Sequence, residues 1–560
     1  MKYLNKIKQI FSTFSITEKV IFLLFLTILI VSSLGILISV NNKFLVSIPE
    51  RGGTLIEGVI GTPRFINPVI ANSNADRDIS SLIYSGLTKT LPNGEIAPDL
   101  AERFEISENG LIYDFYLREG IVFHDKEIIT SEDVIFTVLK IQDPEIRSPR
   151  ISEWEGVAIE NVSDRQIRFV LEQPNTNFLE KTNVGILPKH LWKETPNDAF
   201  SLNLYNIEPI GSGPYKINKI SRDNINIPKS YTLSINKNYT LKSPSINKIV
   251  FKFAKNENEL IEMINNNEVN AISNISPVSL GEIEKEGFQI ITSTLPRVFG
   301  IFINQTESPS LSLDSARQAL LLATPKQQIV EGVFSNYAQV AETPIPNFPT
   351  EERMEFNLEQ AEQVLIDAGW EKNEEGFYTV EIDEEKFLLS TSISTSNIPE
   401  LVEVAEMIVS SWRKIGVDAS VKIFETSDLN QNVIRPRNFE TLLFGNVIEN
   451  YSDLYSFWHS SRRNDPGLNI TSYANIKTDE ILEEILNTDK ESSKAKVEDF
   501  ISELNNDIPA IFLYSPSFTY LISNEIKGIE IDNISTSDNR FRNVGEWFIK
   551  TDRVWEIFKN

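Results

Sequence analysis

The sequence predicts a mixed α/β protein with several lobes, preceded by one membrane-spanning helix. Three observations support this fold class. The chain has 560 residues, which is too long for one hydrophobic core and suggests about three or four lobes. Segments with strand periodicity alternate with segments with helix periodicity. One uncharged apolar run, Val20–Val40, lies near the N-terminus and has no counterpart later in the chain.

The composition is that of a folded, acidic protein. The 79 acidic and 53 basic residues give a net charge of −26. Nucleic-acid binding requires a basic surface, so this balance argues against a nucleic-acid partner. The chain has no cysteine and three histidines. Disulfides, thiolate metal sites, cysteine nucleophiles and a lipid-modified cysteine anchor are therefore excluded.

The first forty residues predict a membrane anchor. Residues 20–40 form a run of apolar and small residues that is long enough to cross a hydrocarbon core of about 30 Å. The preceding segment 1–19 is expected in the cytoplasm, because it carries the lysines that the positive-inside rule retains there. A cleaved signal peptide is the alternative, but the run exceeds a usual signal core and no A-x-A-like site follows it. Residues 41–53 read as a tether to the extracytoplasmic part.

The first elements after the tether alternate between strand and helix. Thr54–Ile60 reads as a strand. Apolar and small residues at 79, 82, 83 and 86 have the spacing of a buried helical face. Tyr113–Leu117 alternates apolar and polar residues and is expected to be a strand. Thr130 precedes Asp133 by three residues, the pattern of a capping box at the start of a helix.

The second half of the chain contains helix–strand units. A helical face predicted within 357–370 stops at Gly369, and another within 401–416 stops at Gly416. The segment 417–423 then alternates as a strand, so a helix leads into a strand through one glycine. Further strands are predicted near residues 246–253, 298–304, 441–446 and 510–515. No repeat of fixed period is present.

No arrangement of residues typical of catalysis is present. The nucleophile-elbow, zinc-protease, phosphate-loop and dinucleotide-binding motifs are absent from the sequence. Gly211–Lys216 lacks the spacing of a phosphate loop and reads as a tight turn entering a strand. His459, Ser460 and Asp453 are close in sequence, but members of a triad seldom are. We therefore expect no enzyme activity, no cofactor and no metal.

The segment Leu100–Ile141 resembles the signature region of the family-5 extracellular solute-binding proteins, the oligopeptide-, dipeptide- and nickel-binding receptors of ABC importers. In that pattern a Leu-Arg-x-Gly-x-x-Phe-His-Asp/Asn-Gly turn precedes an Asp-Val pair at a helix start. The chain has Lys126 in place of the turn glycine. The matching residues are Leu117, Arg118, Gly120, Phe123, His124, Asp125, Asp133 and Val134. Similar elements follow in the family's order over about residues 54–545.

The resemblance implies a periplasmic-binding-protein-like fold with two lobes around a cleft and an inserted subdomain. Lobe I is expected to comprise residues 54–74, 206–295 and 507–560. The inserted subdomain would be 75–205 and lobe II 296–506. The resemblance also implies that His124 is a scaffold residue, hydrogen-bonded within its turn, and not a catalytic group.

The resemblance further implies where a ligand would lie. Peptides in such receptors bond through their backbone to edges of the cleft, in the manner of an added strand. By position these edges are Asn72, Ser73 and Asn74 on one side and Asn446, Val447 and Ile448 on the other. Tyr514 is expected either to line the pocket or to pack in the core.

One departure from the family pattern concerns a free α-amine on the ligand. Receptors that bind such an amine carry an aspartate where this chain has Asn450. A buried ammonium paired only with a neutral amide loses several kcal/mol of hydration energy without compensation. Either Glu449 or Asp453 supplies the charge, or the ligand has no free N-terminus. Trp458 is a residue type that stacks on sugars or aromatic rings, although it is equally typical of a core.

The sequence thus predicts a single-pass membrane protein that captures peptides or peptide-like solutes for the permease of an ABC importer. Two alternatives remain at this stage. One is a non-transporting sensor or surface-assembly protein with the same fold. The other is a receptor for a non-peptide solute such as a sugar or a metal chelate.

Overall fold

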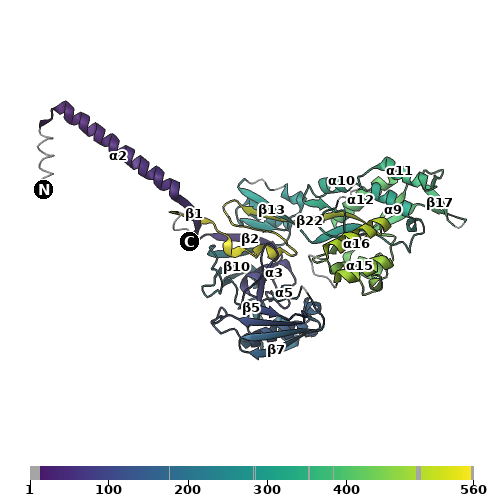
Figure 1. Cartoon of the computed structure of the whole chain (residues 1–560), viewed down its shortest axis with the longest axis horizontal. Helices are drawn as coiled ribbons and strands as arrows, with labels where there is room; N and C mark the ends of the chain where they lie inside the picture. Colours follow the sequence, from purple (N-terminus) through teal and green to yellow (C-terminus); the bar gives the residue numbers. More distant parts are fainter. Residues whose placement is uncertain are drawn as a thin grey trace.

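The computed structural model describes residues 13–555, except residues 176, 282, 284, 285, 351–353, 383 and 487–492. The chain forms one long N-terminal helix and a mixed α/β body, so the predicted fold class is confirmed (Figure 1). Of the predicted cytoplasmic segment 1–19, residues 1–12 lie outside the described residues.

The N-terminal helix α2 (Ile16–Phe44) projects away from the body (Figure 1). Ser15 and Glu18 form a capping box at its start. Its segment Ile16–Leu37 is long and apolar enough to cross a membrane, and no residue of its most apolar stretch is buried against the body. The helix leads directly into β1 (Leu45–Glu50), which pairs with β23 (Lys550–Trp555).

Two sheets of the body share one strand, β22 (Ala510–Ser523). Sheet I contains six further strands: β9 (Tyr215–Arg222), β10 (Pro228–Ile235), β11 (Lys248–Ala254), β2 (Thr54–Ile60), β12 (Ala271–Ser273) and β13 (Phe288–Thr294). Sheet II contains five further strands: β14 (Arg297–Ile303), β21 (Thr441–Val447), β19 (Ser390–Ser396), β20 (Asp418–Phe424) and β15 (Ala338–Val340). The predicted strands at 54–60, 417–423 and 441–446 are therefore confirmed.

The chain crosses between the two sheets at two adjacent places. Leu295 and Pro296 separate β13 of sheet I from β14 of sheet II. Within β22, residues up to Tyr514 pair with β14, and residues from Ser517 onward pair with β13. The Leu295 N–H donates to the Pro516 carbonyl at 2.9 Å, so the two crossings are joined by a hydrogen bond. Two short crossings side by side are the arrangement expected of a hinge.

Separate cores support the two sheets. Leu55, Ile249, Phe251 and Tyr520 belong to the core of sheet I, which continues into the region between residues 79 and 200. Sheet II is covered by helices with their own cores. These helices are α9 (Asp314–Leu322), α10 (Lys326–Gly332), α11 (Leu358–Asp367), α12 (Pro399–Lys414), α14 (Asp453–Trp458), α15 (Ile476–Leu486) and α16 (Lys494–Asp507). The predicted helix ends are confirmed, because Gly369 and Gly416 follow α11 and α12 with φ of 84° and 82°.

The segment between α3 (Asn74–Ile83) and β9 contains a smaller sheet with the order β5-β6-β8-β7. Its strands are β5 (Ala101–Ile106), β6 (Ile112–Leu117), β8 (Gln166–Leu171) and β7 (Val157–Ser163), and α4 (Ser131–Gln142) packs on them. The predicted capping box is confirmed, because the Asp133 carboxylate accepts the Thr130 N–H at 2.9 Å. Lys126 takes a φ of 79°, the left-handed conformation for which a glycine is favoured.

His124 joins this smaller sheet to the segment that enters β9. Its Nε2 lies 3.2 Å from the Gly213 carbonyl, and its Nδ1 accepts the Gly211 N–H at 3.3 Å. Burial lowers the pKa of His124 to about 4. The expected bond within its own turn is thus replaced by bonds to residues 211–213, a contact between segments that sequence spacing does not reveal.

Candidate functional site

The sheet II side of the site is built at the end of β21, beside the crossings. Asn446 and Val447 pair with Val298 and Arg297 of β14. The Ile448 N–H then donates to the Pro296 carbonyl at 2.9 Å. Asn446 and Ile448 are buried, whereas Val447 is 40% exposed. The predicted edge 446–448 is therefore fixed against one of the two crossings.

The loop after β21 is held by Asp453. One carboxylate oxygen of Asp453 accepts the N–H groups of Glu449 and Asn450 at 2.9 and 2.8 Å. Burial raises the pKa of Asp453, while these two bonds act in the opposite direction. Asp453 thus organises its own loop, so its carboxylate is less available to pair with a ligand ammonium. Glu449 is exposed and Asn450 is half-buried.

The sheet I side is built at the start of α3. Asn72, Ser73 and Asn74 are exposed, and Ser73 caps the helix through a capping box with Asp76. Arg77 donates to the Asn72 carbonyl at 2.8 Å and to Asn74 Oδ1 at 2.9 Å. A capped helix start and an arginine therefore give this edge a defined shape.

Charged groups from the C-terminal part of the chain lie beside this edge. Asp538 belongs to η7 (Ser537–Phe541), and its Oδ1 lies 4.0 Å from Arg77 Nε. Burial lowers the pKa of Arg542, and the carboxylates of Asp538 and Glu449 act in the opposite direction. Arg542 follows η7 and Glu449 follows β21, so carboxylates from both of these regions act on the pKa of Arg542.

Arg77, Asp538 and Arg542 were not predicted as site residues. The C-terminal run that contains two of them has no motif that marks it in the sequence. Arg77 is four residues after the helix cap Ser73, where an arginine is usually a solvated surface residue. The contact between these segments arises from tertiary structure, because Arg77 and Asp538 are 461 positions apart in the sequence.

The two predicted aromatic residues lie in the core of sheet II. Trp458 is 1% exposed, and its ring lies 6.1 Å from that of Phe302 and 6.0 Å from that of Phe512. Tyr514 is also 1% exposed and stacks on Phe299 with ring centres 5.1 Å apart. Both rings are enclosed by other side chains, so packing is the role that their surroundings support.

His459, Ser460 and Asp453 do not assemble as a triad. His459 Nδ1 lies 2.8 Å from the hydroxyl of Ser461, while the Ser460 hydroxyl donates to Asp479. Asp453 is engaged with the backbone of residues 449 and 450. Among the described residues no group of three or more histidine or acidic side chains is placed to hold a metal ion.

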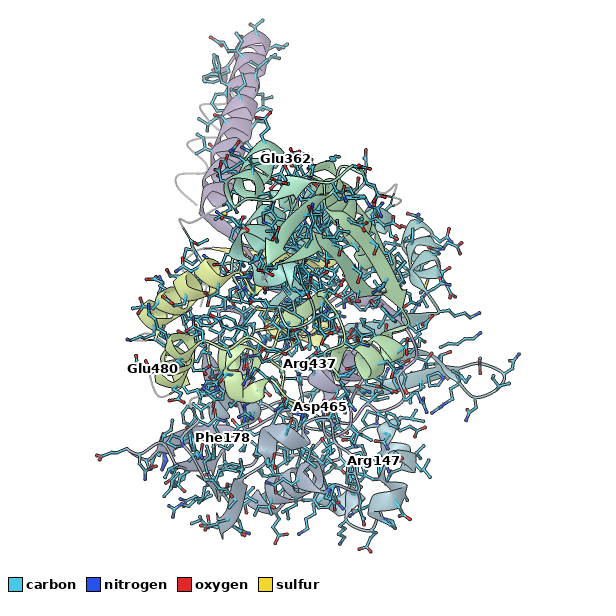
Figure 2. All side chains as sticks on the ribbon, turned by 90° about the vertical axis from the view of Figure 1, so that its right-hand side faces the viewer. Arg147, Phe178, Glu362, Arg437, Asp465 and Glu480 are labelled. Atoms are coloured by element: carbon cyan, nitrogen blue, oxygen red, sulfur yellow. The ribbon has the colours of Figure 1, made fainter. Side chains whose placement is uncertain are left out.

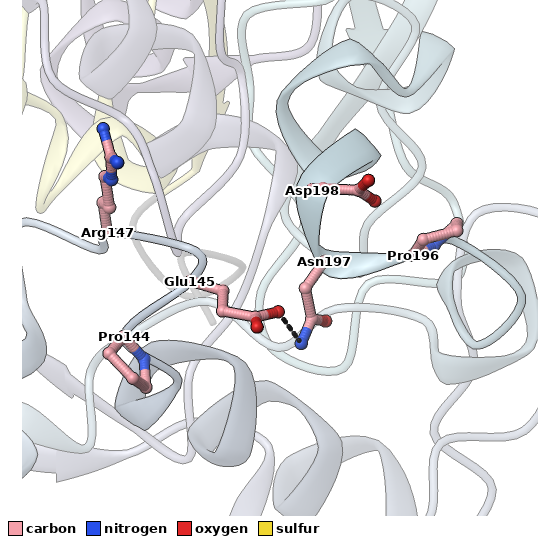
Figure 3. A pocket seen from close by; sticks show the side chains of 6 residues that line it. All are labelled: Pro144, Glu145, Arg147, Pro196, Asn197 and Asp198. Carbon is pink, nitrogen blue, oxygen red and sulfur yellow. Dashed lines mark hydrogen bonds between the residues drawn. The ribbon is translucent and has the colours of Figure 1, made fainter.

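A surface hollow lies elsewhere on the molecule. It has a volume of about 670 Å³ and is lined by Pro144, Glu145, Arg147, Pro196, Asn197 and Asp198 (Figure 3). These residues belong to the region of the smaller sheet, and none of them is a predicted site residue. Asn197 donates to Glu145 at 3.4 Å across it. We regard this hollow as a surface feature distinct from the site at the crossings.

Comparisons with known proteins identify the family to which this chain is similar. Residues 95–467 match the family described as bacterial extracellular solute-binding proteins, family 5 Middle. The oligopeptide-binding protein AppA of Bacillus subtilis is 27% identical over 495 residues, covering 86% of this chain and 89% of AppA.

Solved structures are similar over almost the same range. AppA of Bacillus subtilis, solved in complex with a nonapeptide, has a TM-score of 0.66 and 25% identity, covering 90% of this chain and 100% of AppA. NikZ of Campylobacter jejuni, solved in complex with Ni(L-His), has a TM-score of 0.66 and 26% identity, covering 88% of this chain and 99% of NikZ. With its sheets joined by two crossings and a family match over most of its length, the chain belongs to the family-5 bacterial extracellular solute-binding proteins.

Proposed function

We propose that this protein is a membrane-anchored receptor that captures peptides or peptide-like solutes outside the cytoplasm for an ABC importer. The observation that carries the proposal is the pair of crossings at Leu295–Pro296 and within β22. Sheets that are joined through so narrow a region rotate toward each other readily, and a ligand that contacts both favours the closed state. No covalent step is required.

The proposed lobes are those expected from the sequence: residues 54–74, 206–295 and 507–560 for lobe I, 75–205 for the inserted subdomain and 296–506 for lobe II. The ligand would lie between the exposed edge 72–74 and the edge 446–448. An extended peptide would bond to backbone groups of these edges in the manner of an added strand. Relatives described as oligopeptide- and dipeptide-binding proteins support this ligand class.

The proposed anchor is α2, with the N-terminus in the cytoplasm. The exposure of its apolar residues favours a lipid environment, because moving apolar surface out of water lowers its free energy. An anchor of this kind would keep the receptor close to its permease.

Binding to the full-length protein in detergent or lipid nanodiscs tests the proposal. Peptides of three to nine residues are titrated into the protein by calorimetry. The peptides are then recovered, and their masses are measured by mass spectrometry. We expect saturable binding with recovery of intact peptides. A matched control is Glu145→Gln, which changes the separate hollow and should leave the affinity unchanged. Flat titrations across the peptide set, or recovered fragments, would contradict the proposal.

A further inference from the structure

A third segment of the chain lies beside the two crossings between the sheets. Strand β15 of sheet II pairs antiparallel with β22 where β22 leaves sheet II, so that Ala338 lies opposite Pro516. Just before β15, the Tyr337 carbonyl accepts the Ser517 N–H at 3.0 Å. Ser517 already belongs to the part of β22 that pairs with β13 of sheet I. The segment before β15 is therefore bonded to the sheet I side of the crossing, although the chain does not cross there.

The side chain of Tyr337 also reaches sheet I. It is half-buried and packs against a second core of this sheet, to which Leu260, Ile272 and Leu521 belong. These three residues come from α7 (Glu257–Asn265), from β12 and from the sheet I part of β22. Among the described residues of 297–506, Tyr337 is the one buried or half-buried hydrophobic side chain that packs against a core of sheet I. Tyr337 thus joins the two sheets outside the crossings.

The turn that presents Tyr337 is fixed in sheet II. Phe334 packs on Tyr514 in the core of sheet II, with ring centres 4.3 Å apart. Ser335 and Asn336 then take φ of 46° and 66°, which are left-handed values that few residues with a Cβ atom adopt. The Tyr337 N–H donates to the Phe334 carbonyl at 2.7 Å and closes the turn. A backbone of this kind persists only where its surroundings hold it, and here the surroundings belong to both sheets.

We propose that Tyr337 is a positioning residue that fixes the angle between the two lobes. Two adjacent crossings alone leave rotation of the lobes about them largely unrestricted. A side chain that is held in one lobe and packs in the core of the other restricts this rotation, and so narrows the set of arrangements that exchange before a ligand binds. The inference rests on the two-lobed receptor of the proposed function and adds the residue that limits its motion.

The absence of native cysteines allows a direct test with two spin labels. Glu262 of α7 and Glu403 of α12 are exposed residues of the two lobes. In a full-length E262C/E403C protein without peptide, pulsed electron resonance gives the distribution of distances between the labels. Adding Tyr337→Ala should broaden this distribution about 1.5-fold or more, because alanine does not reach the core of sheet I. Tyr337→Phe keeps the ring and should give the parent distribution. Equal widths for the alanine variant and the parent would overturn the inference.

Tyr205→Ala is the matched control, because Tyr205 is a half-buried tyrosine that packs against one core only. It should leave the width unchanged, and an equal broadening by this variant would also overturn the inference. If Tyr337→Ala does not fold, Tyr337→Leu takes its place with the same two outcomes, because it keeps an apolar side chain. Peptide is then added to the labelled parent. A parent that binds no peptide contradicts the proposed function, whereas the widths measured without peptide decide the role of Tyr337 in either case.

Discussion

Arg540 and Asp78 form a fully buried ion pair with two parallel hydrogen bonds. The two guanidinium nitrogens lie 2.9 and 2.7 Å from the carboxylate oxygens, and the side chains are 0% and 1% exposed. Arg540 also donates to Glu57 at 2.9 Å, and Tyr520 donates to the other oxygen of Glu57 at 2.9 Å. This network joins β2, α3, β22 and η7. It therefore links the helix that begins at the 72–74 edge to the strand that crosses between the sheets.

Removing one partner of this network should destabilise the fold strongly. We expect Asp78→Asn to lower the free energy of unfolding by about 1.5 to 3 kcal/mol, because Arg540 loses charge-assisted hydrogen bonds to one of its two buried carboxylate partners and keeps Glu57. Glu105→Gln is the control, since its pair with Arg103 is more than half exposed on both sides and is worth about 1 kcal/mol or less. Urea denaturation followed by tryptophan fluorescence gives both values. Equal effects of the two substitutions would contradict the assigned role.

Trp458 should behave as a core residue and not as a ligand contact. Trp458→Ala removes a side chain that is 1% exposed and is expected to cost about 3 to 5 kcal/mol. Trp458→Phe keeps most of the packing and should cost much less. Calorimetric titration with a peptide that binds the unchanged protein should give the same affinity for the Trp458→Phe variant. A loss of affinity greater than tenfold without loss of stability would instead place the ring in the ligand pocket.

Acidification should destabilise the contact made by His124. Its folded pKa is about 4 and its ordinary value is 6.5, so the unfolded chain binds the proton more readily. The associated stability is complete above about pH 6.5 and is lost as the pH falls toward 4. Between pH 7 and 4.5 the free energy of unfolding should fall by roughly 2 to 3 kcal/mol through His124. The His124→Gln variant should lack this contribution.

Thermal melts of both proteins across this range test the prediction. Asp99 acts in the opposite direction, because burial raises its pKa to about 6. That contribution is the same in both proteins and cancels in the difference between them. If the melting temperatures of the two proteins change by the same amount over this pH range, His124 does not carry the pH dependence.

The sequence predicted the regular elements well and the contacts between distant segments poorly. The strand at 54–60 and the helix ends at Gly369 and Gly416 follow from local periodicity and from glycine's access to positive φ. The partners of His124 at 211–213, and the charged group of Arg77, Asp538 and Arg542, depend on tertiary structure. Trp458 shows the same limit, because composition does not distinguish a buried tryptophan from one that binds a ligand.

The neutral side chain at position 450 should set the preference for the ligand's N-terminus. Asn450→Asp introduces a carboxylate at the position where the family resemblance implies one for the free amine of a ligand. A hydrogen bond to a charged group is worth about 1.5 to 3 kcal/mol, so the variant should gain about tenfold or more in affinity for peptides with a free N-terminus. Matched free and N-acetylated peptides, titrated against both proteins, measure the change. Asn446→Asp tests whether any added acid has the same effect, and an equal gain in that variant would contradict a specific role for position 450.

The most direct test of the central claim is a distance between the two halves with and without peptide. Glu145 is an exposed residue of the smaller-sheet region, and Glu480 is an exposed residue of α15. Figure 2 labels Glu480 and also Arg147, which lies two residues after Glu145. An E145C/E480C variant carries two spin labels, and pulsed electron resonance gives the distance distribution. We predict that a bound peptide shortens the mean distance and narrows the distribution. Identical distributions at saturating peptide would contradict capture by closure of the two halves.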